Sequence, residues 1–184
     1  SIAGYGFEIY HDKAKDTVMA ILMLAMMVPF VAVLVPLFQM FTKAKLINSW
    51  TGFILPSIAT PFLIMYFRNS ARSFPRDTLE AARIDGLNEF QIFIRMFIPM
   101  MKPTYASAAT ITFMGAWNAY LWPKVVMQTN EAITMPMLVA NTMGGYVIDY
   151  GVVMAAVTIC SLPTVIIFFC LQKSFTNAVA GAVK

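Results

Sequence analysis

Glu80-Ala81-Ala82-Arg83-Ile84-Asp85-Gly86 is a charge-rich segment in a largely apolar chain. Pro75 suits the first position of a helix that includes this segment, because the N–H that proline lacks would have no partner there. Alanine favours helix and adds no bulk, so Ala81 and Ala82 are expected to leave a flat surface. Gly86 can adopt the left-handed conformation that ends a helix. The segment therefore predicts a helix followed by a sharp turn.

The residues after Gly86 predict a second, shorter helix. Asn88 and Glu89 can open this helix, which is expected to cover residues 89–96 before Pro99 breaks the backbone again. The result is a helix–turn–helix hairpin over residues 75–99. From spacing alone, the hairpin is equally well interpreted as a solvated loop or as a docking element for a partner protein, and both interpretations stay open at this point.

The composition is that of a membrane protein. The 184 residues are 59% hydrophobic and only 12% charged, and the mean hydropathy is +0.70. A soluble domain usually carries about 25% charged residues. The net charge of +4 is small, so the positions of the cations are more informative than their number.

Uncharged runs along the chain are long enough to be candidate membrane spans, which need about 20 apolar residues. These four runs are residues 18–41, 50–67, 104–123 and 150–171. They predict an all-α, polytopic membrane domain that includes the whole of residues 1–184. The first two runs each contain two prolines, which indicates either bent or interrupted helices that line a cavity or simple packing kinks.

The distribution of lysine and arginine predicts the orientation of the chain. Of the thirteen cations, two precede the first run, six lie in the loop over residues 70–102 and its immediate border, and two lie in the C-terminal tail. The opposite side carries only Lys43, Lys45 and Lys124. The hairpin and the C-terminus are therefore expected on the cytoplasmic side. The long external loop is expected to contain a short helix around residues 135–143.

The sequence carries few groups that could support catalysis or ion coupling. The four runs contain no Asp, Glu, Lys, Arg or His, so a neutral substrate is expected. The chain has a single histidine and no Gly-x-x-x-x-Gly-Lys-Ser/Thr segment, so neither a metal site nor ATP binding by this chain is predicted. It is not expected to be an enzyme. Residues 117–123 place Asn118 among aromatic rings, which suits either a sugar contact or a hydrogen bond between helices.

Two segments resemble a known family. Glu80-Ala81-Ala82, Gly86 four positions later and Met96-Phe97-Ile98-Pro99 resemble the cytoplasmic EAA loop of permease subunits of ABC importers, with Met96 and Ile98 as conservative changes. Residues 117–123 are similar to the Trp-Asn-x-x-Leu-Trp-Pro signature of carbohydrate-importer permeases of the maltose type. The resemblance covers essentially the whole chain, as the C-terminal portion of a longer permease.

The resemblance implies a type I permease core in the cell (inner) membrane and an importer of mono- or oligosaccharides. It implies a second permease subunit, two ATP-binding cassette ATPase subunits that hold the ATP, an extracytoplasmic sugar-binding protein and surrounding membrane lipid as partners, with no nucleic acid and no cofactor in this chain. The coupling set carried over to this sequence is Glu80, Ala81, Ala82, Asp85, Gly86 and Pro99. The implied substrate path is Trp117, Asn118 and Trp122, and the implied tail contacts are Asn177, Gly181 and Lys184.

Other functions remain as alternatives. A permease for another small polar solute, such as glycerol phosphate, shares the pattern. A secondary transporter would need internal repeats and charged groups within its spans, and neither is visible. A non-transporting membrane scaffold would use the hairpin as a plain interaction site. The sequence does not identify the sugar.

Overall fold

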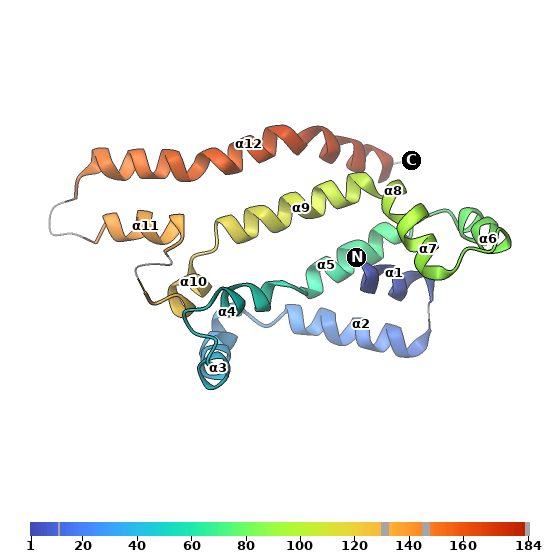
Figure 1. The fold of residues 1–184 in the computed structure, drawn as a ribbon, viewed down its shortest axis with the longest axis horizontal. Helices are drawn as coiled ribbons and strands as arrows, with labels where there is room; N and C mark the ends of the chain where they lie inside the picture. The colour runs from blue at the N-terminus through green and yellow to red at the C-terminus, as the bar shows by residue number, and fades with distance from the viewer. Residues whose placement is uncertain (11, 130–132, 145–147, 183–184) are drawn as a thin grey trace. The chain divides into compact units, whose positions relative to one another are not determined.

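A computed structural model describes residues 1–10, 12–129, 133–144 and 148–182, with the backbone alone beyond residue 170. The described part is helical and contains no strand, as the composition predicted (Figure 1). In chain order the elements are α1 (Ile2–Ile9), α2 (Lys13–Met26), α3 (Phe30–Lys43), α4 (Trp50–Ile54), the 3₁₀ helix η1 (Leu55–Ser57), α5 (Pro61–Ala71), α6 (Arg76–Ile84), α7 (Glu89–Ile92), the π-helix η2 (Phe93–Phe97), α8 (Ile98–Met100), α9 (Lys102–Trp117), α10 (Leu121–Val126), α11 (Met135–Thr142) and α12 (Tyr150–Ala182).

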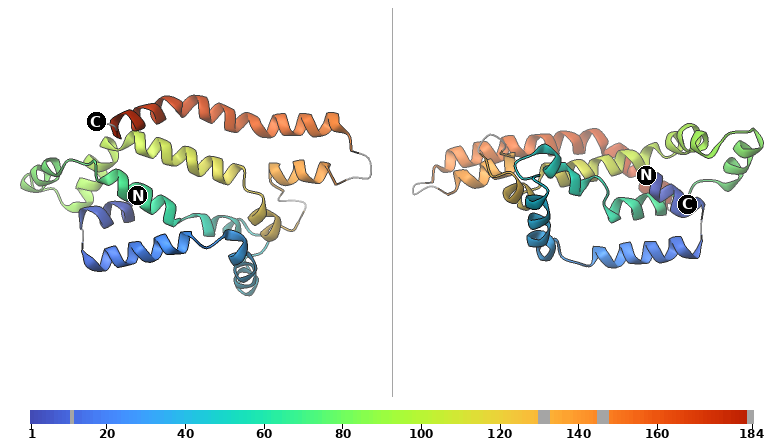
Figure 2. Two further views of the ribbon diagram at one scale, coloured as in Figure 1. Left: turned by 180° about the vertical axis from the view of Figure 1, so that it is seen from behind. Right: turned by 60° about the horizontal axis from the view of Figure 1, so that its bottom comes forward.

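The chain divides into two compact units. Unit 1 comprises Ser1–Val28 and Ala59–Ala109 together with the end of α12, and unit 2 comprises Pro29–Ile58 and Thr110–Gln172. Unit 1 contains the predicted hairpin and the helices that support it. In unit 1 the hairpin extends beyond the ends of α1 and α5, which can be followed from two further directions in Figure 2.

Unit 1 is organised around a close crossing of α1 and α5. A Cβ atom built on Gly4 would lie 2.6 Å from the Cβ of Phe67 and 2.7 Å from the backbone nitrogen of Arg68. These atoms belong to the α5 backbone or its first side-chain carbon, so they cannot swing away. Only glycine permits α1 to approach α5 this closely.

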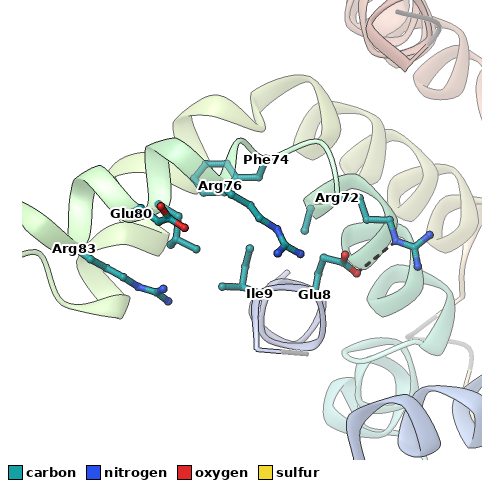
Figure 3. A pocket seen from close by; sticks show the side chains of 9 residues that line it. Glu8, Ile9, Arg72, Phe74, Arg76, Glu80 and Arg83 are labelled. Atoms are coloured by element: carbon teal, nitrogen blue, oxygen red, sulfur yellow. Dashed lines mark hydrogen bonds and ion pairs between the residues drawn. The ribbon is translucent and has the colours of Figure 1, made fainter. Parts of the chain in front are cut away.

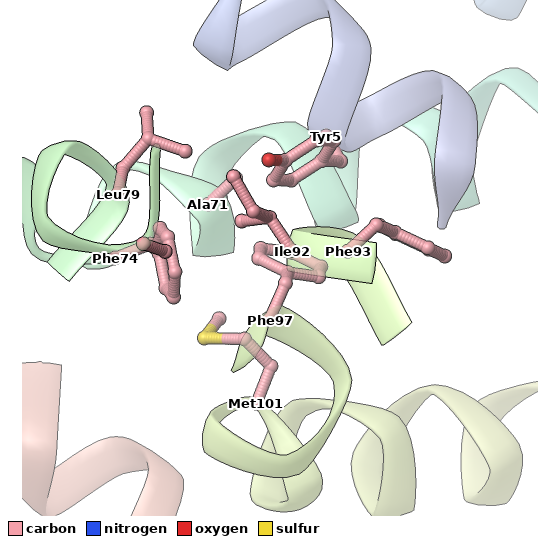
Figure 4. Close-up of a cluster of buried hydrophobic side chains, with 9 residues drawn as sticks. Tyr5, Ala71, Phe74, Leu79, Ile92, Phe93, Phe97 and Met101 are labelled. Carbon is pink, nitrogen blue, oxygen red and sulfur yellow. The ribbon is translucent and has the colours of Figure 1, made fainter. Parts of the chain in front are cut away.

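The core of unit 1 joins α1, α5 and both arms of the hairpin (Figure 4). Its buried members are Tyr5, Ala71, Phe74, Leu79, Ala82, Ile92, Phe93, Phe97 and Met101. The Tyr5 ring packs edge-on against Phe97 with ring centroids 4.8 Å apart. Tyr5 of α1 packs into a core made mostly by hairpin residues. This packing holds the hairpin in a fixed position against α1.

Unit 2 has a smaller core in which Trp122 is central. Trp122 packs edge-on against Phe41 with ring centroids 5.1 Å apart, and its indole N–H donates to the carbonyl oxygens of Gly52 and Phe53 at 3.3 and 3.2 Å. Asn48, with a φ of 57°, accepts a hydrogen bond from the backbone N–H of Gln128. These contacts hold the segment after α3 against the segment after α10.

The predicted spans differ from the observed helices in continuity. By length and composition, one helical stretch among the described residues, Tyr150–Cys170, can cross a membrane, or up to three if each of two broken helix pairs is one span. The run 18–41 is divided between α2 and α3, and the run 50–67 between α4–η1 and α5. The run 104–123 ends as a continuous helix at Trp117, before α10 begins. The expected interruption therefore occurs in both runs that carry two prolines, although Pro36 lies inside α3 without ending it.

Three details of the predicted hairpin were wrong. Pro75 is the N-cap of α6 rather than its first helical residue. The second arm is an α-helix only as far as Ile92, and it continues as the π-helix η2. Pro99 lies inside α8 and does not end the helix there. The Ile98 N–H donates to the Phe93 carbonyl, a π-type bond that shifts the hydrogen-bond register just before the residue that has no N–H to give.

Candidate functional site

The turn between α6 and α7 is a Schellman motif centred on Gly86. Gly86 has a φ of +80°, in the left-handed region that its position in the sequence predicted. The Gly86 N–H donates to the Arg83 carbonyl at 3.1 Å, and the Leu87 N–H donates to the Ala82 carbonyl at 3.1 Å. These bonds satisfy carbonyls that the end of α6 would leave unpaired. The turn is thus fully formed within this chain.

The start of α7 is fixed by a capping box and by an ion pair that crosses the turn. The Gln91 N–H donates to the Asn88 side chain at 2.9 Å, and the Asn88 N–H donates to the Gln91 side chain at 3.0 Å. Arg83 on α6 pairs with Glu89 on α7, with Nε and Oε1 2.8 Å apart. The two arms are therefore held together by polar contacts on the surface and by apolar packing below.

Tyr10, the C-cap of α1, joins this ion pair. Burial, together with the neighbouring Glu89 carboxylate, raises the pKa of Tyr10 to about 12. Burial opposes ionisation of Glu89, but the Tyr10 hydroxyl and the Arg83 guanidinium outweigh it and lower the pKa of Glu89. The hydrogen bond with Glu89 raises the pKa of Arg83. All three groups keep their ordinary charge states at neutral pH.

The six coupling residues expected from the sequence do not share one environment. Glu80, Ala81, Asp85, Gly86 and Pro99 are exposed. Ala82 differs from the other five, because it is only 3% exposed and packs into the core of unit 1. It is therefore not part of the flat exposed surface expected for Ala81 and Ala82. Its small side chain lets α6 approach its own core and offers no surface to a partner.

The two most exposed apolar residues of the hairpin were not among the predicted site residues. Ile84 is 86% exposed and Phe90 is 67% exposed, whereas Ile92 in the same hairpin is completely buried. Large apolar side chains at such exposure commonly mark an interaction surface when they gather on one element. The signal available in the sequence was Ile84 itself, which is an aliphatic residue between Arg83 and Asp85 beside the predicted turn.

A polar cavity of about 160 Å³ lies between the last turn of α1 and the beginning of the hairpin (Figure 3). It is lined by Glu8, Ile9, Ala71, Arg72, Phe74, Arg76, Leu79, Glu80 and Arg83. Glu8 accepts from Arg72 across one side of the cavity, with Oε2 and Nε 3.4 Å apart. The side chain of Glu80, from the motif, therefore stands beside the junction of α1 and the hairpin.

The polar groups of the second signature are engaged within unit 2. The Trp117 indole N–H donates to the Cys160 carbonyl at 2.9 Å, and the Asn118 side-chain NH₂ donates to the Met114 carbonyl at 2.9 Å. Trp122 is only 7% exposed, and its N–H is bound to the segment at Gly52 and Phe53. Of the three residues expected along a substrate path, Asn118 is exposed, Trp117 is half-buried and Trp122 is buried.

The predicted tail contacts lie beyond the part of the chain whose side chains are described. Asn177 and Gly181 lie in the part of α12 for which only the backbone is described, and Lys184 lies outside the described residues. Elsewhere the prediction of a short helix around residues 135–143 is confirmed by α11, Met135–Thr142.

Curated relatives match the whole of this chain. The lactose transport system permease protein LacG of Rhizobium radiobacter is 41% identical over 184 residues, which are 100% of this chain and 67% of the relative. The arabinooligosaccharides transport system permease protein AraQ of Bacillus subtilis is 35% identical over 185 residues, with 100% of this chain and 66% of the relative covered. The chain thus spans about two thirds of the length of these relatives.

The fold and the family are both established by comparison. A bacterial ABC transporter involved in the import of the acidic polysaccharide alginate has a chain of the same fold, with a TM-score of 0.80, 22% identity, and coverage of 92% of this chain and 65% of the other. The expectation of a helical ABC-importer permease fold is confirmed. The model of one family, the binding-protein-dependent transport system inner membrane component, matches residues 1–181. The chain therefore belongs to this family of inner-membrane transport components.

Proposed function

We propose that this chain is a membrane-spanning permease subunit of an ATP-driven importer that moves a sugar into the cytoplasm. The observation that carries the proposal is the hairpin: a preformed, internally braced element that exposes Glu80, Ile84 and Phe90. A solvated loop needs neither a capping box nor an ion pair across its turn. A rigid element with exposed apolar side chains suits a protein partner, here a separate ATPase subunit on the cytoplasmic side.

A sugar is the substrate class that the relatives and the composition support together. The names of the relatives refer to lactose, arabino-oligosaccharides and, for a third that is 29% identical from Thermoanaerobacterium thermosulfurigenes, starch degradation products. The candidate spans carry no charged side chains, which suits a neutral solute better than an anionic one. Asn118 is the candidate substrate contact on this chain, and Trp122 holds the surrounding backbone in place.

The partners follow from the same proposal. A second permease subunit, two ATPase subunits and an extracytoplasmic sugar-binding protein complete the importer, and ATP is bound by the ATPase. The hairpin over residues 75–99 and the C-terminus face the cytoplasm, where the excess of lysine and arginine is expected.

The test is co-purification of the full-length protein from gently solubilised membranes. Wild type is expected to bring down an ATPase that carries a Gly-x-x-x-x-Gly-Lys-Ser/Thr segment, and Glu80→Lys is expected to lose it. Lys13→Gln, on an exposed part of α2, is the matched control and should retain the ATPase. If the wild type brings down no ATPase and also supports no solute uptake, the importer proposal fails and a membrane scaffold becomes the better interpretation.

A further inference from the structure

A cluster of charged side chains joins three helices of unit 1 immediately before the hairpin begins. Arg68 on α5 donates from Nη2 to Oδ1 of Asp16 on α2 at 2.8 Å, and from Nε to Oε2 of Glu8 on α1 at 3.3 Å. Arg72, the C-cap of α5, reaches the same oxygen of Glu8 at 3.4 Å. We name Glu8, Asp16, Arg68 and Arg72 the charge clamp.

Arg68 is the centre of the clamp because it is buried. Its side chain is 10% exposed and that of Glu8 is 18% exposed, whereas Asp16 and Arg72 are 45% and 61% exposed. Buried ion pairs often add little stability, because apolar residues of similar volume stabilise the fold as well or better. Such a pair does fix the relative orientation of the two groups, since it is strong only when they keep one geometry.

The clamp and the hairpin are connected through α1. Tyr5 of α1 lies in the hairpin core, with its ring centroid 5.2 Å from that of Phe93, and Glu8 stands less than one turn further along the same helix. Gly4 places the α1 backbone against the backbone nitrogen of Arg68. A displacement of the hairpin that carries Tyr5 must therefore carry Glu8, and with it the Arg68 guanidinium.

The clamp also attaches α2 to the other helices of unit 1. Met19 is the buried residue of α2, and most of its other apolar side chains are exposed. Apolar contacts of this kind can slide, because they have no preferred direction. The Asp16–Arg68 bond fixes α2 to the part of α5 that immediately precedes the hairpin.

We propose that Arg68 is a positioning residue for transport: through Glu8 and Asp16 it makes α2 follow the movement that the ATPase imposes on the hairpin. The inference rests on the proposed function, because the hairpin moves only if an ATPase drives it. Arg68 touches neither substrate nor ATP in this scheme. Its role is to convert movement of the hairpin into movement of a membrane helix.

The test needs a variant that removes the charges without leaving one of them buried and unpaired. The triple variant Glu8→Gln/Asp16→Asn/Arg68→Met replaces the clamp with neutral side chains of similar size, and Lys13→Gln on α2 is the control. Spin labels at Ala14→Cys on α2 and Asp77→Cys on α6, both exposed, report the distance from α2 to the hairpin after the native cysteines are replaced by serine.

In the importer complex with a wild-type clamp, the label distance is expected to be the same without nucleotide and after trapping with ATP and vanadate, because α2 and the hairpin move together. In the triple variant the distance distribution should broaden and shift on trapping. Uptake per ATP hydrolysed, measured with lactose and an arabino-oligosaccharide as probes, should fall by about tenfold, within the usual range of coupling between distant sites. The single variant Arg68→Lys keeps the charge, so its uptake per ATP hydrolysed should fall less than that of the triple variant.

Several outcomes would overturn the inference. A triple variant with the wild-type distance in both states, and with uptake per ATP like that of Lys13→Gln, would show that the clamp transmits nothing. A triple variant that fails to accumulate in the membrane would assign the clamp to folding. If no ATPase accompanies the wild type, the proposed function fails instead, and the label distribution of the isolated protein still decides whether the clamp holds α2 to the hairpin.

Discussion

Replacing Ile84 with alanine should weaken ATPase binding without affecting the fold. Ile84 is 86% exposed in this chain, so almost its whole side chain is available for burial by a partner. The substitution removes three carbon atoms, each worth about 0.8 kcal/mol when buried, or about 2 kcal/mol together. Because 1.4 kcal/mol is a factor of ten, the Kd of the ATPase should rise by about 30-fold.

The matched control is the same substitution at Ile92, eight residues further along the hairpin. Ile92 is 0% exposed and lies in the core of unit 1. Ile92→Ala should therefore destabilise the protein by about 2–5 kcal/mol through the lost contacts and the cavity left behind. Ile84→Ala should change the stability by no more than about 0.5 kcal/mol, as surface substitutions usually do.

The assay is a titration of purified ATPase onto the full-length permease in nanodiscs, with the thermal unfolding of each variant measured alongside. Phe90→Ala, at a side chain that is 67% exposed, should behave like Ile84→Ala. A Kd for Ile84→Ala within twofold of wild type would refute the assignment of the exposed apolar residues to the docking surface. A fall in unfolding temperature equal to that of Ile92→Ala would refute the assumption that Ile84 is free of the core.

Further predictions concern single positions whose geometry is specific. Gly86→Val should uncouple ATP hydrolysis from uptake, because a β-branched residue is strongly disfavoured at a φ of +80°. Gly86→Asn, which tolerates this conformation, should retain most of the uptake per ATP hydrolysed. Gly52→Ala should reduce the amount of folded protein in the membrane, because its Cβ would lie 2.0 Å from the Leu46 carbonyl oxygen, whereas Gly115→Ala, which meets nothing within 4 Å, should not. Glu89 has a pKa below its usual value of 4.5, so the stability it gives to the hairpin is present above that pH and is lost as the pH falls through its lowered pKa; Glu89→Gln should remove this dependence in acid-unfolding curves.

The hairpin was largely predictable because its signals are local. A glycine at the end of a helical segment, and Asn88 before an acidic residue, each act through the nearest few peptide groups, and both take the expected conformation in the structure. Pro99 was predicted wrongly for an equally local reason. The rule that proline ends a helix assumes an α-helical register, and the π-type bond from Ile98 to Phe93 changes that register just before Pro99.

Contacts between distant residues were beyond what the sequence could indicate. Ala82 looks like a surface residue by its neighbours, but it is buried because Tyr5, 77 positions earlier in numbering, completes the core on which α6 rests. Arg68 counts as one more cytoplasmic cation in the charge pattern, yet in the fold it is shared between Glu8 and Asp16 on two other helices. The positive-inside pattern that predicts orientation treats every arginine alike. It cannot separate Arg83, which braces the hairpin, from Arg68, which ties α1 and α5 to α2. That difference decides which substitution should weaken docking and which should weaken the proposed transmission of movement.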